Sequence, residues 1–297
     1  MRIVSLLPSA TDIVVTLGGT PMLVGVSHSC DLPAGTALPR VTASAVDPNA
    51  PSAEIDVAVR EIASSGRALY ALNETLIERL APDLIITQSL CEVCAVSESA
   101  VRRLAARLPG APRVVSLGGG TIDAVLDDIA TVGRETGLAD EAEELVLGLR
   151  RRMRTVHETL KAARAPRPRV AVLEWTDPLF SGGHWVPEQV RRAGGADALA
   201  QPGEHSRVVT HAQLQDADAE IVLVAPCGFG VERAAAEARS TIAAIPSLRD
   251  RQVWAVDANA LTSRPGPGIV TGIEAMARIF APGLFSPIGE SVARRVR

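Results

Sequence analysis

Short apolar runs alternate with helical patterns along residues 1–120. The apolar runs are rich in β-branched residues or leucine and end in polar, glycine or proline positions, which predicts buried strands at Arg2–Leu7, Met22–Val26, Asp83–Thr87 and Arg113–Leu117. Helical patterns lie between them, for example Asn73–Leu80 and Ser97–Leu108, and a proline follows each one closely. Alternating strands and helices predict a mostly parallel sheet with helices on its faces.

The middle of the chain has a different pattern. Residues 121–165 are helical throughout, with one break at Gly137-Leu138, and the stretch Ala139–Ala165 is dense in good helix formers before Pro166. A helix of that length spans roughly 40 Å, enough to run along two lobes. An ordinary long surface helix would have the same pattern.

The second half then repeats the order of the first. Strands are expected at Arg169–Glu174, Ala219–Ala225 and Gln252–Val256, again with helical patterns between them. The chain is therefore expected to be α/β, with two Rossmann-like lobes joined by a single long backbone helix: an N-terminal lobe 1–120, a helical linker 121–165 and a C-terminal lobe 166–297. Because ligands bind beyond the carboxyl ends of parallel strands, we expect a ligand cleft between the lobes.

Composition narrows the function. Of the 297 residues, 47% are hydrophobic, and the formal net charge of −4 argues against a nucleic-acid binder. No apolar stretch approaches the roughly 18 residues of a membrane span. The opening residues Met1–Leu7 are too short for a secretory signal, so we expect a cytoplasmic protein with reduced thiols. Its expected partner is a small-molecule ligand.

The four cysteines all follow predicted strands. Cys30 follows the second strand, Cys91 and Cys94 form a CxxC beyond Thr87, and Cys227 lies just beyond Ala225. Four thiolates at strand ends would complete a tetrahedral zinc site or a [4Fe-4S] cluster. A thiol site without metal, or small buried cysteines, are the alternatives.

Histidine and aromatic residues cluster in the same loops. His28 lies near Cys30 and is a candidate metal ligand or cobalt-facing base, while a loop histidine held by hydrogen bonds is the plainer interpretation of both His28 and His184. Three aromatic residues flank the Pro178–Gly183 turn and would form an apolar wall for a large flat ligand: Trp175, Phe180 and Trp185. Trp185 could instead close the core of its lobe.

Charged and hydroxyl residues complete the candidate site. Arg264 lies in a Pro/Gly loop and could clamp a carboxylate or phosphate, with Asp257 as its partner. Ser9 and Thr11 open a helix, where we expect one of them to cap it, with anion binding as the alternative. The Gly118-Gly119-Gly120 run lacks the spacing of a dinucleotide-binding loop.

Several segments resemble one known family. These are Ile3–Asp12, Leu23–Ser27, Leu80–Ile85 and Pro178–Gly195. Nearly end to end, the chain resembles the helical-backbone (TroA/BtuF-like) periplasmic binding proteins of cobalamin and iron-siderophore transport. It is most similar to a branch usually labelled cobalamin-binding protein, through Ser27–Asp31, Cys91–Ala95, Gly183–Pro187, Pro226–Phe229 and Ser263–Pro267.

The resemblance implies a two-lobed fold and a binding site for a corrinoid. It places Phe180 at a position where a ring packs on the corrin in the transport members. At two other ring positions of those members this chain has Ser29 and Leu69, and Tyr70 lies next to Leu69. It also places Thr75 and Ala212 where those members dock on an ABC permease through glutamates, which makes such docking doubtful.

Two functions are consistent with these patterns. The first is a ligand-binding protein for a corrinoid or another large metal chelate, held by Ser9, His28, Tyr70, Phe180, His184, Trp185, Asp257 and Arg264. The second is a cytoplasmic enzyme or sensor that carries an iron–sulfur cluster or zinc on the four cysteines.

Overall fold

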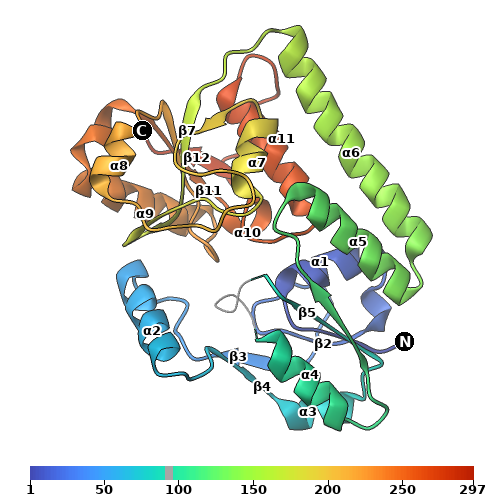
Figure 1. The fold of residues 1–297 in the computed structure, drawn as a ribbon. Coiled ribbons are helices and arrows are strands. Elements are labelled where there is room, and N and C mark those ends of the chain that lie inside the picture. Colours follow the sequence, from blue (N-terminus) through green and yellow to red (C-terminus); the bar gives the residue numbers. More distant parts are fainter. Residues whose placement is uncertain (91–95) are drawn as a thin grey trace. The chain divides into compact units, whose positions relative to one another are not determined.

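The computed structural model describes residues 1–90 and 96–297, and the chain divides into two compact units (Figure 1). Unit 1 comprises Met1–Gly119 and Asp123–Val146, and unit 2 comprises Gly120–Ile122 and Leu147–Arg297. Each unit is an α/β structure built on a largely parallel sheet, which confirms the predicted fold class. The residues 121–165, predicted as a separate linker, are shared between the two units, and Asp123–Val146 belongs to unit 1.

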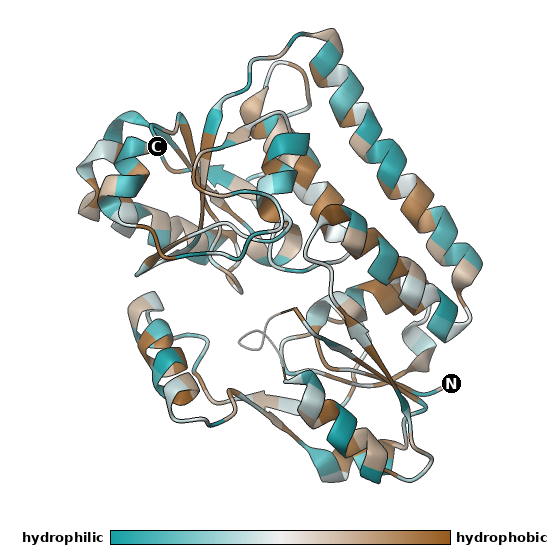
Figure 2. Ribbon diagram, in the orientation of Figure 1, coloured by the Kyte–Doolittle hydropathy of each residue, from teal (hydrophilic) through white to brown (hydrophobic). Residues whose placement is uncertain are grey.

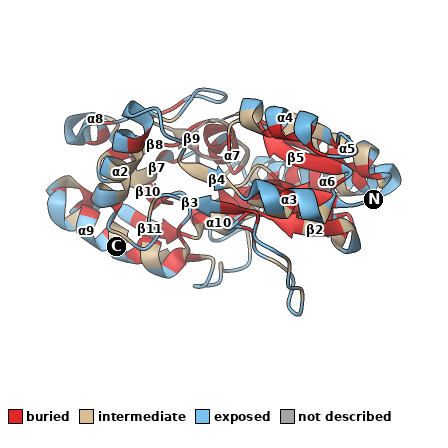
Figure 3. Cartoon of the chain, turned by 90° about the horizontal axis from the view of Figure 1, so that it is seen from below, coloured by how far each residue is buried: buried red, intermediate tan, exposed pale blue. Residues whose placement is uncertain are grey.

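Unit 1 is built on a sheet of four parallel strands in the order β2-β1-β5-β6: β1 (Ile3–Ser5), β2 (Leu23–Val26), β5 (Leu84–Gln88) and β6 (Arg113–Leu117). All residues of β1 and of β5 (red in Figure 3) are buried, as expected for parallel strands covered on both faces. β1 is shorter than the predicted strand Arg2–Leu7, because α1 already begins at Pro8, whose fixed φ suits a first helical turn.

The helices of unit 1 lie between or after its strands in the chain, and some of them share a buried apolar cluster with the sheet. They are α1 (Pro8–Thr16), the 3₁₀ turn η1 (Thr20–Met22), α2 (Ser52–Ser64), α3 (Glu74–Leu80), α4 (Glu98–Arg107) and α5 (Ile122–Thr136). Asn73 caps α3, as its side chain accepts a hydrogen bond of 3.0 Å from the Leu76 amide. Ile77 from α3 and Leu104 from α4 join Ile85 of the sheet in one buried cluster.

A separate two-stranded ribbon was not predicted. β3 (Thr42–Ser44) pairs antiparallel with β4 (Tyr70–Leu72), and Thr42 lies opposite Leu72. Each strand has three residues and few of them are buried, so neither shows the apolar alternation that marks a half-buried strand.

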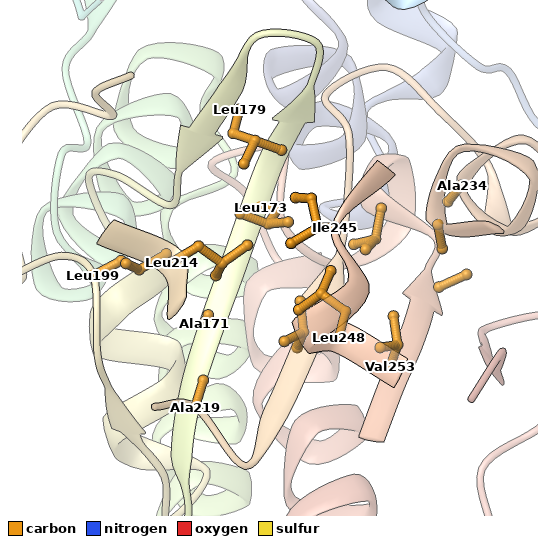
Figure 4. Close-up of a cluster of buried hydrophobic side chains, with 14 of the residues drawn as sticks. Ala171, Leu173, Leu179, Leu199, Leu214, Ala219, Ala234, Ile245, Leu248 and Val253 are labelled. Atoms are coloured by element: carbon orange, nitrogen blue, oxygen red, sulfur yellow. The ribbon is translucent and has the colours of Figure 1, made fainter. Parts of the chain in front are cut away.

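Unit 2 repeats the parallel core and extends it. Its central strands are parallel: β7 (Arg169–Thr176), β10 (Ile221–Val224) and β11 (Gln252–Val256). A short parallel strand, β9 (Ala196–Asp197), pairs with the start of β7. Two antiparallel strands extend the sheet, β8 (Leu179–Ser181) next to β7 and β12 (Ala293–Arg295) next to β11. Leu173, Leu214, Ile245 and Leu248 belong to one apolar cluster in this unit (Figure 4). The helices are α7 (Val186–Arg192), α8 (His211–Asp216), α9 (Val231–Ala244), η2 (Pro246–Asp250), α10 (Ala258–Leu261) and α11 (Gly268–Phe280).

One long helix belongs to both units. α6 (Ala139–Ala162) begins in unit 1 and ends in unit 2. Its buried side chains recur at helical spacing, at Ala142, Leu149, Met153 and Val156, and the rest of its surface is mostly hydrophilic (Figure 2). The prediction to Ala165 runs a few residues too far, because Arg164 has a φ of 48° and closes the helix end.

Close packing holds each end of α6 within its unit. In unit 1, Gly133 of α5 leaves so little space that a Cβ there would lie 2.3 Å from the Ala142 Cβ. In unit 2, Arg152 donates two hydrogen bonds of 2.8 Å to the carboxylate of Glu274 on α11. No helix in the described part of the chain is both long enough and apolar enough to cross a membrane.

Candidate functional site

Candidate residues lie just beyond the carboxyl ends of parallel strands in each unit. In unit 1, Ser9 follows β1, and His28 and Cys30 follow β2. In unit 2, Cys227 follows β10 and Asp257 follows β11. Ligands bind at this edge of parallel sheets.

His28 and Tyr70 form a stacked pair in unit 1. Their ring centroids are 5.5 Å apart at an interplanar angle of 28°. The His28 Nδ1 lies 2.8 Å from the Thr42 Oγ1, which also accepts a hydrogen bond from the His28 amide. Burial, together with the positive charge of Arg40, lowers the pKa of His28 below its ordinary value. The imidazole is thus held neutral and flat against the phenol near neutral pH.

The position of this pair depends on elements that lie apart in the sequence. His28 lies in the loop after β2, Thr42 lies on β3 and Tyr70 on β4, so the β3–β4 ribbon brings Tyr70 to the histidine. Arg40 fixes the same loop, since its Nη1 donates to the carbonyls of Ser27 and Cys30 at 2.9 and 2.6 Å. The sequence pattern indicated His28 and Tyr70 individually, and it missed Thr42 and Arg40.

The Cys30 thiol is buried among hydroxyl groups. The Thr11 Oγ1 donates to its sulfur at 3.0 Å, and the Ser27 Oγ lies 3.1 Å from it. Only 3% of the residue is exposed. Cys227 in unit 2 is exposed, and Cys91 and Cys94 lie outside the described residues. Within residues 1–90 and 96–297, no group of three or more His, Cys, Asp or Glu side chains could hold a metal ion.

The expectation that Ser9 or Thr11 caps α1 is wrong. The N-cap position is Leu7, and no side chain caps the helix. Thr11 is one turn too far along and turns its hydroxyl to Ser5 and Cys30 instead. Ser9 is 2% exposed, and its Oγ has no hydrogen-bond partner among the residues that the structure describes.

In unit 2, Trp175 and Phe180 lie side by side on a hairpin. They are directly paired residues of β7 and β8 and therefore share one face, and both are half-buried. Trp175 also contacts Phe229 at a centroid distance of 5.3 Å, and its Nε1 donates to the Asp177 carbonyl at 3.1 Å. The Arg233 guanidinium covers the Phe229 ring at 3.5 Å. These contacts give Trp175 a fixed orientation.

Trp185 has a different environment from its predicted one. The residue is 6% exposed, and its Nε1 donates a hydrogen bond of 2.9 Å to the Thr262 carbonyl. This is the environment of a core tryptophan with its polar atom satisfied, so the structure argues against a ligand-facing wall at this position. The neighbouring His184 has a φ of 53° and packs edge-on against His205 at 4.8 Å. Burial and His205 lower the pKa of His184.

Asp257 caps a helix. Its Oδ1 accepts a hydrogen bond of 3.1 Å from the Ala260 amide at the start of α10. Arg264 is half-buried in the loop between α10 and α11. The Asp257–Arg264 ion pair and the role of Arg264 as an anion clamp stay predictions.

The sequence pattern missed a pair of half-buried acids beside the hairpin. Glu174 lies in β7, and its Oε1 accepts a hydrogen bond of 3.2 Å from the Gly183 amide. Burial, with a smaller contribution from the negative charge of Asp197, raises the pKa of Glu174 to about 8. Burial also raises the pKa of Asp197 to about 6. A glutamate inside a strand pattern gives no sign of whether its carboxyl faces solvent.

Comparison with protein families identifies the fold. A family model described as periplasmic binding protein matches residues 3–260. The chain belongs to this family. No curated protein sequence matches the chain to a significant degree.

Solved structures of several binding proteins have a similar fold. A periplasmic heme-binding protein from Pseudomonas aeruginosa superposes with a TM-score of 0.72 at 22% identity, over 99% of this chain and 97% of that one. The periplasmic vitamin B12-binding protein BtuF of Vibrio cholerae gives 0.66 at 21% identity, over 94% and 96% of the two chains. The heme-binding protein RhuT from Roseiflexus sp. RS-1 gives 0.68 at 20% identity, over 96% and 99%.

Family membership confirms the predicted periplasmic-binding-protein resemblance, while its cobalamin branch stays a prediction. The two positions that the resemblance aligns with permease contacts are surface positions in the structure. Thr75 on α3 and Ala212 on α8 are both exposed, and Glu74, beside Thr75, is paired with Arg107 at 3.0 Å. Neither Thr75 nor Ala212 carries a charge for docking.

Proposed function

We propose that this member of the periplasmic binding protein family binds a large planar metal chelate, a corrinoid or a heme. The observation that supports this most is the placement of its few aromatic rings. The chain has four Phe, three Trp and one Tyr, yet Tyr70, Trp175 and Phe180 lie half-buried beside the carboxyl ends of parallel strands. Flat macrocycles are bound through such rings, supplemented by a few polar groups.

Each unit supplies its own ring surface. In unit 1 the His28–Tyr70 stack is held by Thr42, and in unit 2 the Trp175–Phe180 pair is supported by Phe229. His28 also provides an imidazole whose lowered pKa leaves it neutral, the form that coordinates a cobalt or iron centre. The similarity to heme-binding and vitamin B12-binding structures supports the ligand class but does not choose between the two macrocycles.

The test is an anaerobic absorption titration of the purified protein with hydroxocobalamin and, separately, with hemin. We expect a saturable spectral change with one of the two at micromolar concentration. Coordination by His28 would shift the visible bands, and His28→Ala would remove that shift. If neither macrocycle binds at about 100 μM, where even weak specific sites are occupied, the proposal is wrong.

The four-cysteine site is the second candidate, and the position of Cys30 is the observation in its favour. Its sulfur lies at the carboxyl edge of the unit 1 sheet and accepts a hydrogen bond from Thr11, which would also stabilise a ligating thiolate. Iron, zinc and sulfide analysis of anaerobically purified protein tests it. Protein free of iron and zinc would exclude a cluster or zinc enzyme and leave the chelate proposal standing. A cytoplasmic location also stays a prediction.

A further inference from the structure

A cavity of about 560 Å³ lies in unit 2, and none of the candidate ligand-binding residues described above lines it. It is formed by the last turn of α6 with the residues directly after it, and by the end of α7. The residues after α6 lead directly into the start of β7, so the cavity lies at the amino edge of the parallel strands. The aromatic rings proposed to bind the chelate lie at the carboxyl edge.

The cavity is lined by five permanent cations: Lys161, Arg164, Arg167, Arg191 and Arg192. No aspartate or glutamate is among its lining residues. Glu188 offsets part of this charge, since its carboxylate lies 3.3 Å from Arg191 and 2.8 Å from Arg192. In the part of the chain that the structure describes, no carboxylate lies within 4.0 Å of the side-chain nitrogens of Lys161, Arg164 or Arg167, which leaves a local excess of positive charge.

Helix ends explain only part of this cluster. Cations are common in the last turn of a helix, where they oppose the negative end of the helix dipole, and Lys161, Arg191 and Arg192 occupy such positions. Arg164 and Arg167 lie beyond the end of α6, where the dipole no longer accounts for them. The free carbonyls of that helix end already accept backbone hydrogen bonds, for example from Ala163 and Ala165.

The lining of the cavity also includes apolar residues. Gly194 has a φ of 92°, a conformation that favours glycine, and a Cβ at this position would lie 2.9 Å from the Leu160 Cδ1, so α7 ends close to α6. Leu160, Ala165 and Pro166 contribute apolar surface between the cations. A volume of several hundred Å³ lined by apolar residues and cations matches a small organic ligand that carries several negative charges.

We propose that this cavity is a second binding site, specific for a phosphorylated small molecule with at least two negative charges. Guanidinium groups bind phosphate oxygens in pairs, and Arg164 and Arg167 stand beside an ammonium at Lys161. The site is independent of the chelate-binding residues, and its test needs no chelate.

The experiment uses inorganic tripolyphosphate as the probe and isothermal titration calorimetry of the full chain at low salt. We expect one binding event per chain, weakened at higher ionic strength by screening. The double variant Lys161→Glu/Arg164→Glu should weaken binding by about tenfold or more, because charge-assisted hydrogen bonds are replaced by repulsion. Circular dichroism would confirm that the variant is folded, and Arg167→Gln gives a milder second variant.

The matched control is Arg150→Glu/Arg154→Glu, which changes the net charge equally on exposed positions of the same helix outside the cavity. It should leave the affinity nearly unchanged. Equal weakening by both double variants would show binding by general charge and overturn the proposal, as would wild-type protein that does not bind tripolyphosphate at millimolar concentration. A second arm tests phosphatidylglycerol vesicles, and binding to vesicles without binding of tripolyphosphate would also overturn it in favour of a membrane surface.

Discussion

The two units share one strand order and differ in the segment that comes after their first strand. In unit 1 the order is β2-β1-β5-β6, and in unit 2 the parallel strands β9-β7-β10-β11 stand in the same relation. β1 has three residues and leads into α1 at Pro8, whereas β7 has eight and turns back as β8. The same βα framework therefore carries a helix start at one carboxyl edge and an aromatic hairpin at the other.

This difference decides which residues each unit offers to a ligand. Unit 1 uses loops and the β3–β4 ribbon to hold a histidine, a tyrosine and a buried thiol through hydroxyl groups. Unit 2 uses the hairpin to hold two rings in register and encloses Glu174 behind it. A shared fold thus fixes where a site forms, while the connections fix its chemistry.

The largest expected effect is a difference in stability between variants of two tryptophans of unit 2. Trp185→Ala should lower the free energy of unfolding by about 3–5 kcal/mol, because it empties a core position and frees the Thr262 carbonyl. Trp175→Ala, at a half-buried position, should cost less than roughly 2 kcal/mol. All three tryptophans lie in unit 2, so the fluorescence of those that remain reports this unit during denaturant unfolding. A nearly neutral Trp185→Ala that abolishes chelate binding would restore the ligand-facing interpretation.

The next effect is a pH dependence carried by unit 2. The folded form keeps the proton of Glu174 up to about pH 8, whereas the unfolded form releases it near pH 4.5. Folding therefore retains a proton in this window, and the free energy of unfolding falls as the pH rises through it.

Glu174→Gln should remove this pH dependence of the free energy of unfolding. Between pH 5 and pH 8.5, the free energy of unfolding of the variant should rise by roughly 2 kcal/mol relative to that of wild type. This is less than the full pKa shift of Glu174 implies, because Glu174 is partly open to solvent. Tryptophan-monitored unfolding at the two pH values measures it, with the exposed Glu158→Gln as control. A gain that is the same at both pH values would mean that Glu174 is ionised in the folded protein.

The smallest effects compare the two ends of α6. Gly133→Ala should destabilise the unit 1 end by about 1–3 kcal/mol, because the new methyl group would overlap Ala142. Arg152→Gln, which breaks a partly exposed ion pair with Glu274, should cost at most about 1 kcal/mol. Hydrogen exchange of α5 and α11 distinguishes the two. Equal protection loss in both helices would show that the two ends of α6 are held with similar strength.

Local patterns in the sequence were enough to predict the parallel cores. Arg113–Leu117 and Gln252–Val256 match β6 and β11 residue for residue, since turn residues flank each apolar run. The β3–β4 ribbon was missed because three-residue strands with exposed faces carry no period. The pairing of His28 with Tyr70 depends on that ribbon and was therefore not predictable from either residue alone.

Side-chain direction was the second limit. Trp175 and Trp185 lie at similar distances from the same turn, yet one is half-buried on a hairpin and the other is enclosed at the start of α7. The sequence pattern predicts Glu174 only as a strand residue. The fold shows that its carboxyl lies against the Gly183 amide. The Cys91-Cys94 prediction lies outside the described residues and stays open.

The central claim is that the aromatic rings of each unit take part in binding a planar chelate, and the affinities of three single variants test it most directly. Each of His28→Ala, Tyr70→Ala and Trp175→Ala should weaken binding of the preferred macrocycle by roughly two- to tenfold through lost ring contact. The exposed His211→Ala, a matched histidine control, should bind like wild type. Wild-type affinity in all three ring variants would contradict the account.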